Sequence, residues 1–577
     1  MDVTINEIAE QLDEFCISVQ DEEILRKLKE LCFVYSCSAE DIVAEWVSYC
    51  VSKTVKKECI PPTLQLLDQL DKEKEMNSKS SKSRKSQSVS TPVYNSKTID
   101  LKSSEHFESP TMDNRRNLSL LDKSPQFSPS SMTPSCFTPS RKYGSRNNAG
   151  DVCLSFGSAD VEWKHSDEIL CSITAFNESI ALQKPYNYMC EKLRDYASIL
   201  NDMILDAAKL FEEKNNIEDW GHIQLPSMET VPVVGRICSD NTGRLSASSL
   251  LLEGSQETSS GQCIPLDVSS LKQFSFFPGQ IIAGTGVNNL GKKFILKSLF
   301  EGLYPPVSSK APDLANCIES LSVVIAAGPF ATSDTFSYEP LFDLLKYIKS
   351  HQPHVVILIG PFVDIKNELI ENGDVNEIYE EVFKRITSEI VKSIDHANTR
   401  VLLVPSSRDA HHDCIYPTPP YSLSCTSRIL QVASDPCVVN IEGVIFAISA
   451  TDILFHMGKE EISHGQMPDR LGRLCSHILT QRHFYPLYPP NDEVNIEYLH
   501  YEANAGLPVM PHVLLLPSDF RYFIKDVNGC CCINPERLTK HSSGGTFARM
   551  KINRIDEKIY AEKHSIIDYV KAEIVKI

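Results

Sequence analysis

The sequence predicts a multidomain α+β protein with four parts: an N-terminal helical bundle, a flexible linker, a small β-barrel and an α/β sandwich of two sheets. Three observations predict this order. Apolar residues recur at helical spacing from Met1 to about Lys74. A stretch rich in Ser and poor in aliphatic residues follows. From Val231 onward, short apolar runs are separated by Gly, Asn and Ser turns, and 577 residues leave room for several domains.

The bulk composition argues against several classes of protein. No uninterrupted apolar run approaches the ~20 residues that span a bilayer, so we expect no membrane association. The acidic N-terminus lacks the apolar core of a secretion signal. A net charge of -19 argues against a simple nucleic-acid coat. The 19 cysteines form no CxxC pair, which favours reduced structural thiols over a zinc ribbon or a disulfide framework.

Residues 1–76 are predicted to form a small helical domain. Thr4–Glu7 is a capping box that opens a first helix, and Asp21 starts a second. Two further helices are expected at about 39–55 and 63–72. A bundle of this size is too small for an enzyme core, so we interpret it as a partner-docking module.

Residues 77–165 are predicted to be a disordered linker, because their composition cannot bury enough surface to offset chain entropy. Basic residues outnumber acidic ones from Asn77 to Gly150, so the folded remainder is more acidic than the whole. The weak basic cluster Lys79–Lys85 is compatible with nuclear import and equally with a solvated linker. Ser-Pro or Thr-Pro steps, which are candidate phosphorylation sites, occur at Thr91, Ser109, Ser124, Ser128, Thr133 and Thr138.

Thr138-Pro139-Ser140-Arg141 adds a basic residue after the proline, which is the pattern read by proline-directed cell-cycle kinases. Each phosphate would add about -1.5 to -2 charge to a basic stretch of chain. The alternative at any one site is ordinary Pro-rich disorder without modification.

Residues 166–310 are predicted to contain one long helix followed by a barrel. The 3.6-residue period runs from Lys184 to about Lys214. Five short strands follow, and together with the Phe277–Gln280 turn they suggest an OB-type barrel. The expected strands are 231–238, 249–253, 263–268, 279–287 and 294–300.

Residues 311–577 alternate between strands and helices and then continue mainly with strands, which predicts an α/β sandwich of two sheets. Helices are expected at 339–350, 375–396 and 468–481. Strands are expected at 321–326, 355–360, 401–405, 437–448, 512–517, 529–534, 545–552 and 571–577.

This last domain has the layout of a two-metal phosphoesterase, but the metal ligands are missing. Such an enzyme places Asp, His or Asn in the loops after its strands, because paired divalent cations need carboxylates, imidazoles and an amide. The loops here read Ala327–Phe330, Gly360–Asp364, Ser406–Asp409 and Pro517–Phe520. A catalytic layout without its ligands indicates a fold kept for its surfaces.

The segment resembles the calcineurin-like phosphoesterase family, whose signatures are DxH, GDxxD, GNH(D/E) and GHxH. The first loop has no acid or imidazole between Leu321 and Ser333, Pro361 replaces the bridging Asp, and Arg408 stands where His is expected. We therefore predict an inactive phosphoesterase domain with no metal, no cofactor and no catalytic residue. The degenerate positions are Gly328, Pro361, Asp364, Ser407, Arg408, Asp409 and Ser518, of which Asp364 and Asp409 still fit their signatures.

An alternative interpretation is a metal-dependent phosphodiesterase with atypical ligands, or a single adventitious metal. The polar residues left in or near these loops are Asp364, Asp409, His411, His412, Asp413, Asp452 and His456. Adjacent side chains such as His411 and His412 point opposite ways on an extended chain. We expect these residues to be structural.

The domain order resembles the B subunits of eukaryotic replicative DNA polymerases, most closely the type found in polymerase alpha–primase. The resemblance covers nearly the whole chain, and one departure is Glu536, where relatives tend to have Gly. The segments that carry it are Phe277–Gln280, Gly360–Asp364, Val404–His412, Ser449–His456, Tyr485–Pro490 and Gly544–Arg549.

The resemblance implies a nuclear, non-catalytic scaffold subunit that takes part in primer synthesis. In that family, the barrel and the phosphoesterase-like domain grip the C-terminal domain of the polymerase alpha catalytic subunit. Primase subunits belong to the same complex, and the N-terminal domain contacts other replication-fork proteins. Any contact of the barrel with DNA is expected to be weak or indirect, because the barrel strands carry few aromatic residues that could stack on bases.

Overall fold

The computed structural model describes residues 5–14, 21–35, 140–157, 170–240, 243–314, 320–394, 398–423, 427–467 and 469–577, with isolated residues at 39, 42, 43, 46, 67, 163 and 317. It contains two compact units. One is N-terminal, and the other, which we call the body, includes Cys136–Ile577.

The N-terminal unit begins with two amphipathic helices, α1 (Ile5–Glu14) and α2 (Glu22–Tyr35). The Asp21 carboxylate caps α2 by accepting a hydrogen bond from the Glu23 amide at 3.0 Å. Their buried residues are Ile8, Leu12, Leu25, Leu28, Leu31 and Cys32. The first two predicted helices are thus confirmed, and most of the third and fourth lies outside the described residues.

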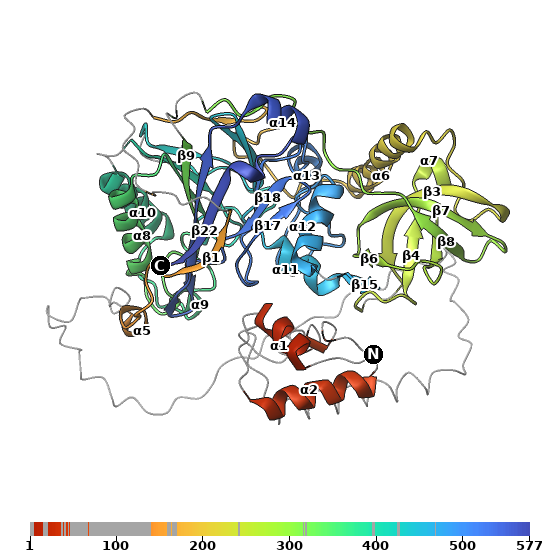
Figure 1. Ribbon diagram of the computed structural model, residues 1–577, viewed down its shortest axis with the longest axis horizontal. Coiled ribbons are helices and arrows are strands. Elements are labelled where there is room, and N and C mark those ends of the chain that lie inside the picture. Colours follow the sequence, from red (N-terminus) through yellow and green to blue (C-terminus); the bar gives the residue numbers. More distant parts are fainter. Residues whose placement is uncertain are drawn as a thin grey trace, which may run out of the picture. The chain divides into compact units, whose positions relative to one another are not determined.

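The body contains a closed five-stranded barrel with the strand order β3-β4-β5-β8-β7. Its strands are β3 (Ser227–Ser239), β4 (Leu250–Glu253), β5 (Cys263–Asp267), β7 (Ile281–Asn288) and β8 (Phe294–Leu299). All five strands were predicted within a few residues. The helix α6 (Leu193–Asn215) packs on the outside of the barrel through Ile204, Ala208 and Phe211 (Figure 1).

The predicted start of this helix at Lys184 is wrong, because α6 begins at Leu193. Residues before it follow the surface of the sandwich instead. The Tyr186 hydroxyl donates to the Pro417 carbonyl at 2.5 Å, and the Tyr188 hydroxyl donates to Asp413 at 3.2 Å. These tertiary contacts override the helical pattern of the sequence.

A seven-stranded sheet forms one layer of the sandwich, in the order β1-β22-β21-β9-β10-β11-β12. Strands β9 to β12 are parallel, as expected from the alternation of strands and helices. The strands are β1 (Val152–Phe156), β9 (Ser320–Ala327), β10 (Val355–Ile359), β11 (Arg400–Val404), β12 (Leu430–Val432), β21 (Thr546–Asn553) and β22 (Val570–Lys576).

A six-stranded sheet forms the second layer, in the order β17-β18-β16-β14-β13-β2. Within it, β14, β16 and β18 run parallel. The strands are β2 (Ile173–Ala175), β13 (Cys437–Ile441), β14 (Val444–Ile448), β16 (Val513–Leu515), β17 (Phe523–Val527) and β18 (Cys530–Asn534).

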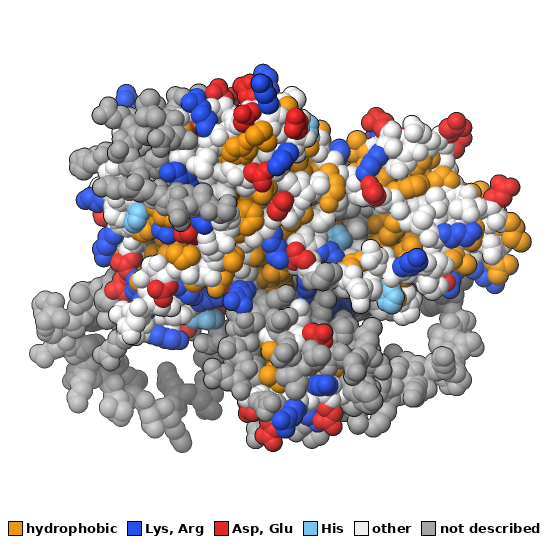
Figure 2. Space-filling model, viewed as in Figure 1, with side chains coloured by type: hydrophobic (Ala, Val, Ile, Leu, Met, Phe, Trp, Pro, Cys, Tyr) orange, Lys and Arg blue, Asp and Glu red, His pale blue; other side chains and the backbone are white. Residues whose placement is uncertain are grey.

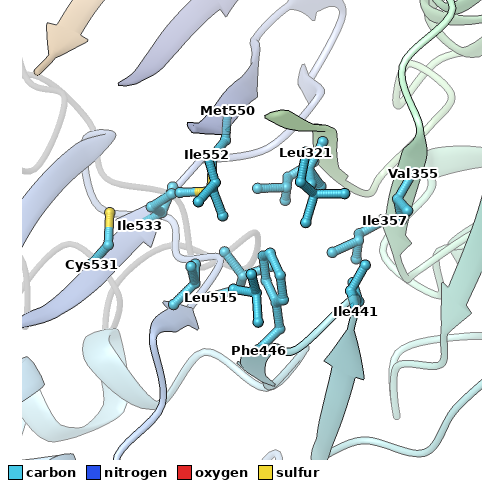
Figure 3. Packing of buried hydrophobic residues seen from close by; sticks show 14 of the residues in the cluster. Leu321, Val355, Ile357, Ile441, Phe446, Leu515, Cys531, Ile533, Met550 and Ile552 are labelled. Atoms are coloured by element: carbon cyan, nitrogen blue, oxygen red, sulfur yellow. The ribbon is translucent and has the colours of Figure 1, made fainter. Parts of the chain in front are cut away.

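The main core lies between these two sheets. Figure 3 shows apolar side chains from both layers meeting there, among them Leu321 and Ile357 from one sheet and Phe446 and Ile533 from the other. The outer face of the seven-stranded sheet is covered by α8 (Glu339–His351) and α10 (Tyr379–Ile394) (Figure 1). Strands β9 and β10 are therefore buried on both faces, which explains their continuous apolar sequence.

Short elements connect these layers. The helices are α5 (Arg141–Gly144), α7 (Gln256–Ser259), α9 (Glu368–Glu371), α11 (Ile453–Glu460), α12 (Arg470–Thr480), α13 (Tyr498–Asn504), α14 (Glu557–Lys563) and the 3-10 helix η3 (Ile567–Tyr569). The strands are β6 (Phe274–Phe276), β15 (Ile462–His464), β19 (Thr539–Lys540) and β20 (Ser543–Gly544). Strands β6 and β15 pair and so join the barrel to the sandwich. No described helix is both long and apolar enough to cross a membrane.

Two edge strands depart from the predicted domain limits. Strand β1 lies within the predicted linker 77–165, yet it pairs with β22 at the edge of the seven-stranded sheet. Strand β2 lies within the predicted barrel domain 166–310, yet it pairs with β13 in the second sheet. Both strands are short, and each pairs with a neighbouring strand on one side only. Their apolar patterns are therefore too brief to stand out in the sequence.

Candidate functional site

The loops after the parallel strands meet at one edge of the sandwich, which we call the strand-tip site. The loops after β9 and β10 touch there, since a side-chain carbon on Gly328 would overlap the Pro361 carbonyl oxygen. The loops after β10 and β11 are joined by a β-bridge between Asp364 and Asp409. The loops after β14 and β16 are joined by the Asp519 amide, which donates to the Asp452 carboxylate at 2.7 Å.

An ion pair occupies the first half of this site. The Arg408 guanidinium donates to both carboxylate oxygens of Asp364, through Nε at 3.2 Å and Nη2 at 2.6 Å. Both side chains are largely buried. A guanidinium has five donors and no acceptor, so it cannot bind a cation, and here it also uses the carboxylate that a metal would need.

Asp409 is the second acidic residue in this half, and it is fully engaged with protein groups. Its Oδ1 accepts from the amides of Phe362 at 2.5 Å and Val363 at 2.9 Å. Its Oδ2 accepts from the Ser406 amide at 3.3 Å and from the Tyr421 hydroxyl. Burial raises the pKa of Asp409 to about 7. This carboxylate therefore holds two loops together.

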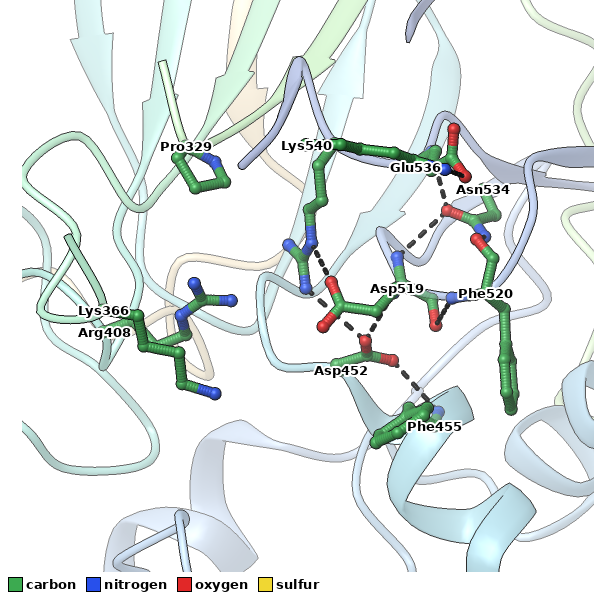
Figure 4. A network of polar contacts seen from close by, with 12 residues as sticks. Pro329, Lys366, Arg408, Asp452, Phe455, Asp519, Phe520, Asn534, Glu536 and Lys540 are labelled. Atoms are coloured by element: carbon green, nitrogen blue, oxygen red, sulfur yellow. Dashed lines mark hydrogen bonds and ion pairs between the residues drawn. The ribbon is translucent and has the colours of Figure 1, made fainter. Parts of the chain in front are cut away.

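A second arginine side chain, that of Arg537, lies in the other half of the site. Arg537 lies between Asp519, whose Oδ1 is 2.9 Å from Nε, and Asp452, whose Oδ2 is 3.5 Å from Nη2. The other oxygen of Asp452 accepts from the Phe455 amide at 3.0 Å and so caps α11. Figure 4 shows Arg408 and Lys366 to the left of Asp452 and Asp519.

Asn534, at the end of β18, organises the neighbouring loop. Its carbonyl oxygen accepts from the amides of Ser518 at 3.0 Å and Glu536 at 2.8 Å, and its amide group donates to the Phe520 and Arg521 carbonyls. Asn534 and Ser518 are both fully buried. All polar atoms of the Asn534 side chain are thus used to hold the backbone.

Glu536 follows in the same loop with a φ of 64°, the left-handed region that favours glycine. The resemblance noted in the sequence analysis implies a glycine at this position. The buried carboxylate forms an ion pair with Lys540 and accepts from the Thr546 hydroxyl at 3.2 Å. Side-chain contacts therefore hold this left-handed turn.

The histidines near the site pack against neighbouring protein groups. The His411 ring stacks on Phe383 with centroids 4.2 Å apart, and burial lowers the pKa of His411 to about 3. His412 Nε2 lies 2.7 Å from the Pro419 carbonyl oxygen. Burial lowers the pKa of His456 to about 4, and its Nδ1 lies 3.1 Å from the Tyr485 hydroxyl. Within the described part of the chain, no three His, Cys, Asp or Glu side chains group as metal ligands.

Comparison with known proteins identifies the family. Residues 6–77 match the N-terminal domain of DNA polymerase alpha B subunits, residues 197–302 match the OB domain of DNA polymerase alpha B subunits, and residues 323–525 match the family of DNA polymerase alpha/epsilon B subunits. The member from Rattus norvegicus, one of the DNA polymerase alpha B subunits, is 36% identical over 611 aligned residues that cover 100% of both chains. The chain belongs to the family of DNA polymerase alpha B subunits.

Other members of the family are similar over much of their length. The Mus musculus member is 36% identical over 96% of both chains. The Schizosaccharomyces pombe member is 34% identical over 68% of this chain and 73% of its own. The OB domain expected from five short strands coincides with the region that matches the family's OB domain.

The site residues proposed from the sequence fall into three groups. Asp364, Arg408 and Asp409 come together in the ion-pair network, and Gly328 packs against Pro361. Ser518 is buried beside Asn534, and Ser407 is half-buried at the tip of β11. The phosphorylation candidates Thr91, Ser109, Ser124, Ser128, Thr133 and Thr138 lie outside the described residues and stay predictions.

Sequence reasoning missed Arg537 and the organising role of Asn534. Arg537 meets Asp452 and Asp519, which are far from it in sequence, so no local pattern reveals the pairing. The only available signal was the segment Asn534–Arg537, which has three polar residues at and just after the end of the apolar strand β18.

Proposed function

We propose that this protein serves as a non-catalytic scaffold of a DNA polymerase alpha–primase complex in the nucleus. The observation that carries the proposal is the strand-tip site, where Arg408 and Arg537 take up the carboxylates that a hydrolase would use for metal ions. Similarity over the full length to DNA polymerase alpha B subunits supports the same assignment.

We further infer that the sandwich is a phosphoesterase-type domain whose ligands have been replaced. Parallel strands that deliver their following loops to one edge of a sheet support this origin. In the proposed complex, the barrel and the sandwich together hold the C-terminal domain of the catalytic subunit. The pairing of β6 with β15 supports this shared role, because it connects the two domains.

The N-terminal unit is the proposed contact for other replication-fork proteins. Its helices are too small to enclose an active site, and a long Ser- and Pro-rich segment separates it from the body. Such a tether raises the local concentration of a bound partner without fixing its position. The proposed phosphorylation sites lie in this tether.

Direct DNA binding by the barrel is proposed to be weak. Proteins that bind single strands use exposed aromatic platforms within a basic groove. Phe274, Phe276 and Phe277 are buried here, and the first two stack on each other at 5.1 Å. On the face shown in Figure 2, acidic and basic side chains are interspersed over the body.

Co-purification tests the proposal. The full chain, carrying an affinity tag, is expected to recover a polymerase catalytic subunit and two primase subunits at near-equal amounts by quantitative mass spectrometry. A catalytic subunit that lacks its C-terminal domain should be lost from the same preparation. Recovery of the chain alone, or with unrelated partners in place of these three, would refute the scaffold role.

The alternative is a metal-dependent phosphodiesterase with atypical ligands, for which Asp364 and Asp409 are the remaining acidic groups. Purified protein is assayed with Mn²⁺ and a chromogenic phosphodiester. Hydrolysis that is lost in Asp364→Ala would favour this alternative. The proposed function predicts no turnover above the Asp364→Ala background.

A further inference from the structure

A cavity of about 410 Å³ lies where the barrel, α6 and the sandwich helix α12 meet, and we call it the junction cavity. Its walls are mainly apolar and come from α6, from β7 and from the segment that follows β8. They include Met203, Leu210, Ile281 and Phe300. Cavities of roughly 300–1,000 Å³ between two domains are typical ligand sites in proteins.

Hydrogen bonds fix the elements around the junction cavity. The Gln481 side chain, at the end of α12, accepts from the Ile281 amide at 2.8 Å and donates to the Ile281 carbonyl at 3.0 Å. The Arg482 guanidinium donates to the carbonyls of Leu303 at 3.1 Å and Tyr304 at 2.7 Å. These contacts hold α12, β7 and the segment after β8 in place, so the cavity is preformed.

His483 is a buried polar residue in the wall of the junction cavity. Its Nδ1 accepts from the Tyr485 amide at 3.2 Å, whereas its Nε2 is buried with no hydrogen-bond partner among the described residues. Burial lowers the pKa of His483 to about 4, so the ring is neutral at pH 7 and carries its proton on Nε2. A buried N–H group without an acceptor is costly, and an acceptor atom of a ligand would satisfy it.

The exposed rim of the junction cavity is acidic. Asp206 of α6 and Glu502 of α13 both line it, and α6 lies beside α13 (Figure 1). Asp202 lies one helical turn before Asp206. Burial, together with the nearby carboxylates of Asp202 and Asp206, raises the pKa of Glu502. These carboxylates disfavour one another's charge, and a cation at the rim would relieve that repulsion.

Two cationic side chains near the rim leave this preference in place. Lys209 pairs with Asp206 at 2.9 Å, but both side chains are about two-thirds exposed, so the pair contributes little. Arg482 also lines the junction cavity, but its guanidinium is bound to two backbone carbonyls. Glu502 forms no ion pair among the residues that the structure describes, and it remains open to a positively charged ligand.

We propose that the junction cavity binds an amphipathic organic cation. The apolar part of the ligand packs against Met203, Leu210 and Phe300, and an ammonium or guanidinium group meets Glu502 and Asp206 at the rim. An acceptor atom on the ligand binds the Nε2–H group of His483. A free amine and a basic side chain of a bound protein share this chemistry, and the last arm of the experiment separates these two sources.

The first test uses the full chain and two probes of the same shape, 2-phenylethylamine and 2-phenylethanol, in ligand-observed NMR titrations at pH 7. The amine is positively charged at this pH and the alcohol is neutral. Saturable binding of the amine is expected at a Kd of about 1 mM, as for a small fragment of this size. The alcohol should bind about fivefold more weakly, because it forms no ion pair at the rim.

A matched pair of substitutions on α6 tests the location. Ala207 lines the junction cavity, whereas Ala197 is exposed on the same helix and does not line it. Ala207→Trp should bind both probes at least about tenfold more weakly, because the indole ring occupies the cavity. Ala197→Trp should bind both probes as the wild type does.

Glu502→Gln tests the charge without changing the shape of the cavity, so it also serves if Ala207→Trp fails to fold. Its affinity for the amine should fall about fivefold, to that for the alcohol, while its affinity for the alcohol stays unchanged. Glu562→Gln, which removes an exposed carboxylate on α14, is the control and should keep the wild-type difference between the two probes.

The source of the cation is tested by repeating the amine titration on the complex with the polymerase and primase subunits, and this arm alone rests on the proposed function. Loss of amine binding in the complex assigns the junction cavity to a basic side chain of a bound subunit. Retained binding assigns it to a free amine. Either result supports the site.

Three results on the chain alone would overturn the proposal: no saturable binding of either probe, equal affinity for the amine and the alcohol, or equal binding by Ala207→Trp and Ala197→Trp. None of these measurements involves another subunit, so a failure here is separate from a failure of the scaffold role.

Discussion

Arg408 is the residue that most changes the chemistry of the strand-tip site. It neutralises a buried carboxylate, so its removal leaves Asp364 buried without this counter-charge. We expect Arg408→Ala to destabilise the body by about 3 kcal/mol, measured as a lower midpoint of thermal unfolding. Arg408→Ala combined with Asp364→Ala should recover much of that loss. Equal midpoints for Arg408→Ala and the wild type would contradict this role.

Glu536 tests the left-handed turn after β18. Both Glu536→Ala and Glu536→Gly remove the ion pair with Lys540, but only alanine keeps a side-chain carbon at a φ of 64°. The glycine variant should therefore be more stable than the alanine variant by about 1 kcal/mol. Thermal unfolding of the two variants measures this difference directly. An alanine variant as stable as the glycine variant would show that the turn has relaxed.

At the scale of single residues, the sequence predicts that metal ligands are missing, but it does not predict which residues contact one another in their place. Pro361 and Arg408 could be recognised because a residue that cannot bind a cation stands where a ligand is expected. The partners that fill the space could not be predicted in the same way. The pairing of Arg537 with Asp519 depends on which loops the fold brings together, and that is a long-range property.

At the scale of secondary-structure elements, the junction between the barrel and the sandwich depends on Glu461, which directly follows α11. Its carboxylate accepts from Arg473 at 2.7 Å and from the Ser275 hydroxyl of β6 at 2.5 Å, and His477 lies 3.2 Å away. We expect Glu461→Gln to weaken the attachment of the barrel by roughly 3 kcal/mol, because the buried Arg473 loses its counter-charge. Limited proteolysis between barrel and sandwich should accelerate. Ser275→Ala, a milder control, should have a smaller effect.

The same carboxylate predicts a pH dependence. Burial alone would raise the pKa of Glu461, but hydrogen bonds from His477 and Arg473 outweigh it and hold the pKa well below the usual range. A depressed pKa in the folded state gives stability that is present above the unfolded value of about 4.3 and is lost as pH falls below it.

This loss of stability should appear as a difference between the wild-type protein and the Glu461→Gln variant. The thermal midpoint of the wild type should fall more steeply below about pH 4.3 than that of Glu461→Gln, which has no carboxyl group to titrate there. Arg470, whose Nε lies 3.9 Å from the carboxylate, is present in both proteins and does not alter the comparison. Parallel pH profiles would show that Glu461 is not held as an anion.

The elements that could be predicted from the sequence are those buried on both faces or covered by long helices. Strands β9, β10 and β11 read as continuous apolar runs because the core and the covering helices enclose them. Strands β1 and β2 are short edges, and their backbone partners β22 and β13 lie hundreds of residues away. Their pairing follows from topology, so composition alone assigned them to the linker and the barrel domain.

The body combines a two-sheet sandwich, whose strand-tip loops meet at one edge, with a closed centre. The two sheets are joined by the packing of their apolar side chains, and backbone pairing joins β6 to β15 and β1 to β22. The carboxylates that remain at the strand tips are bound to arginines and backbone amides. The family resemblance could be recognised from sequence because several of its motifs lie in these loops, whereas the closing contacts required the structure.

The most direct test of this closed centre is the content of bound metal at the strand tips. Crystals of the protein soaked in Mn²⁺ are examined by anomalous diffraction at the manganese edge. The account predicts no ordered ion between the loops after β10, β11 and β16, with Arg408 still paired to Asp364. Two anomalous peaks about 4 Å apart at that place would contradict it.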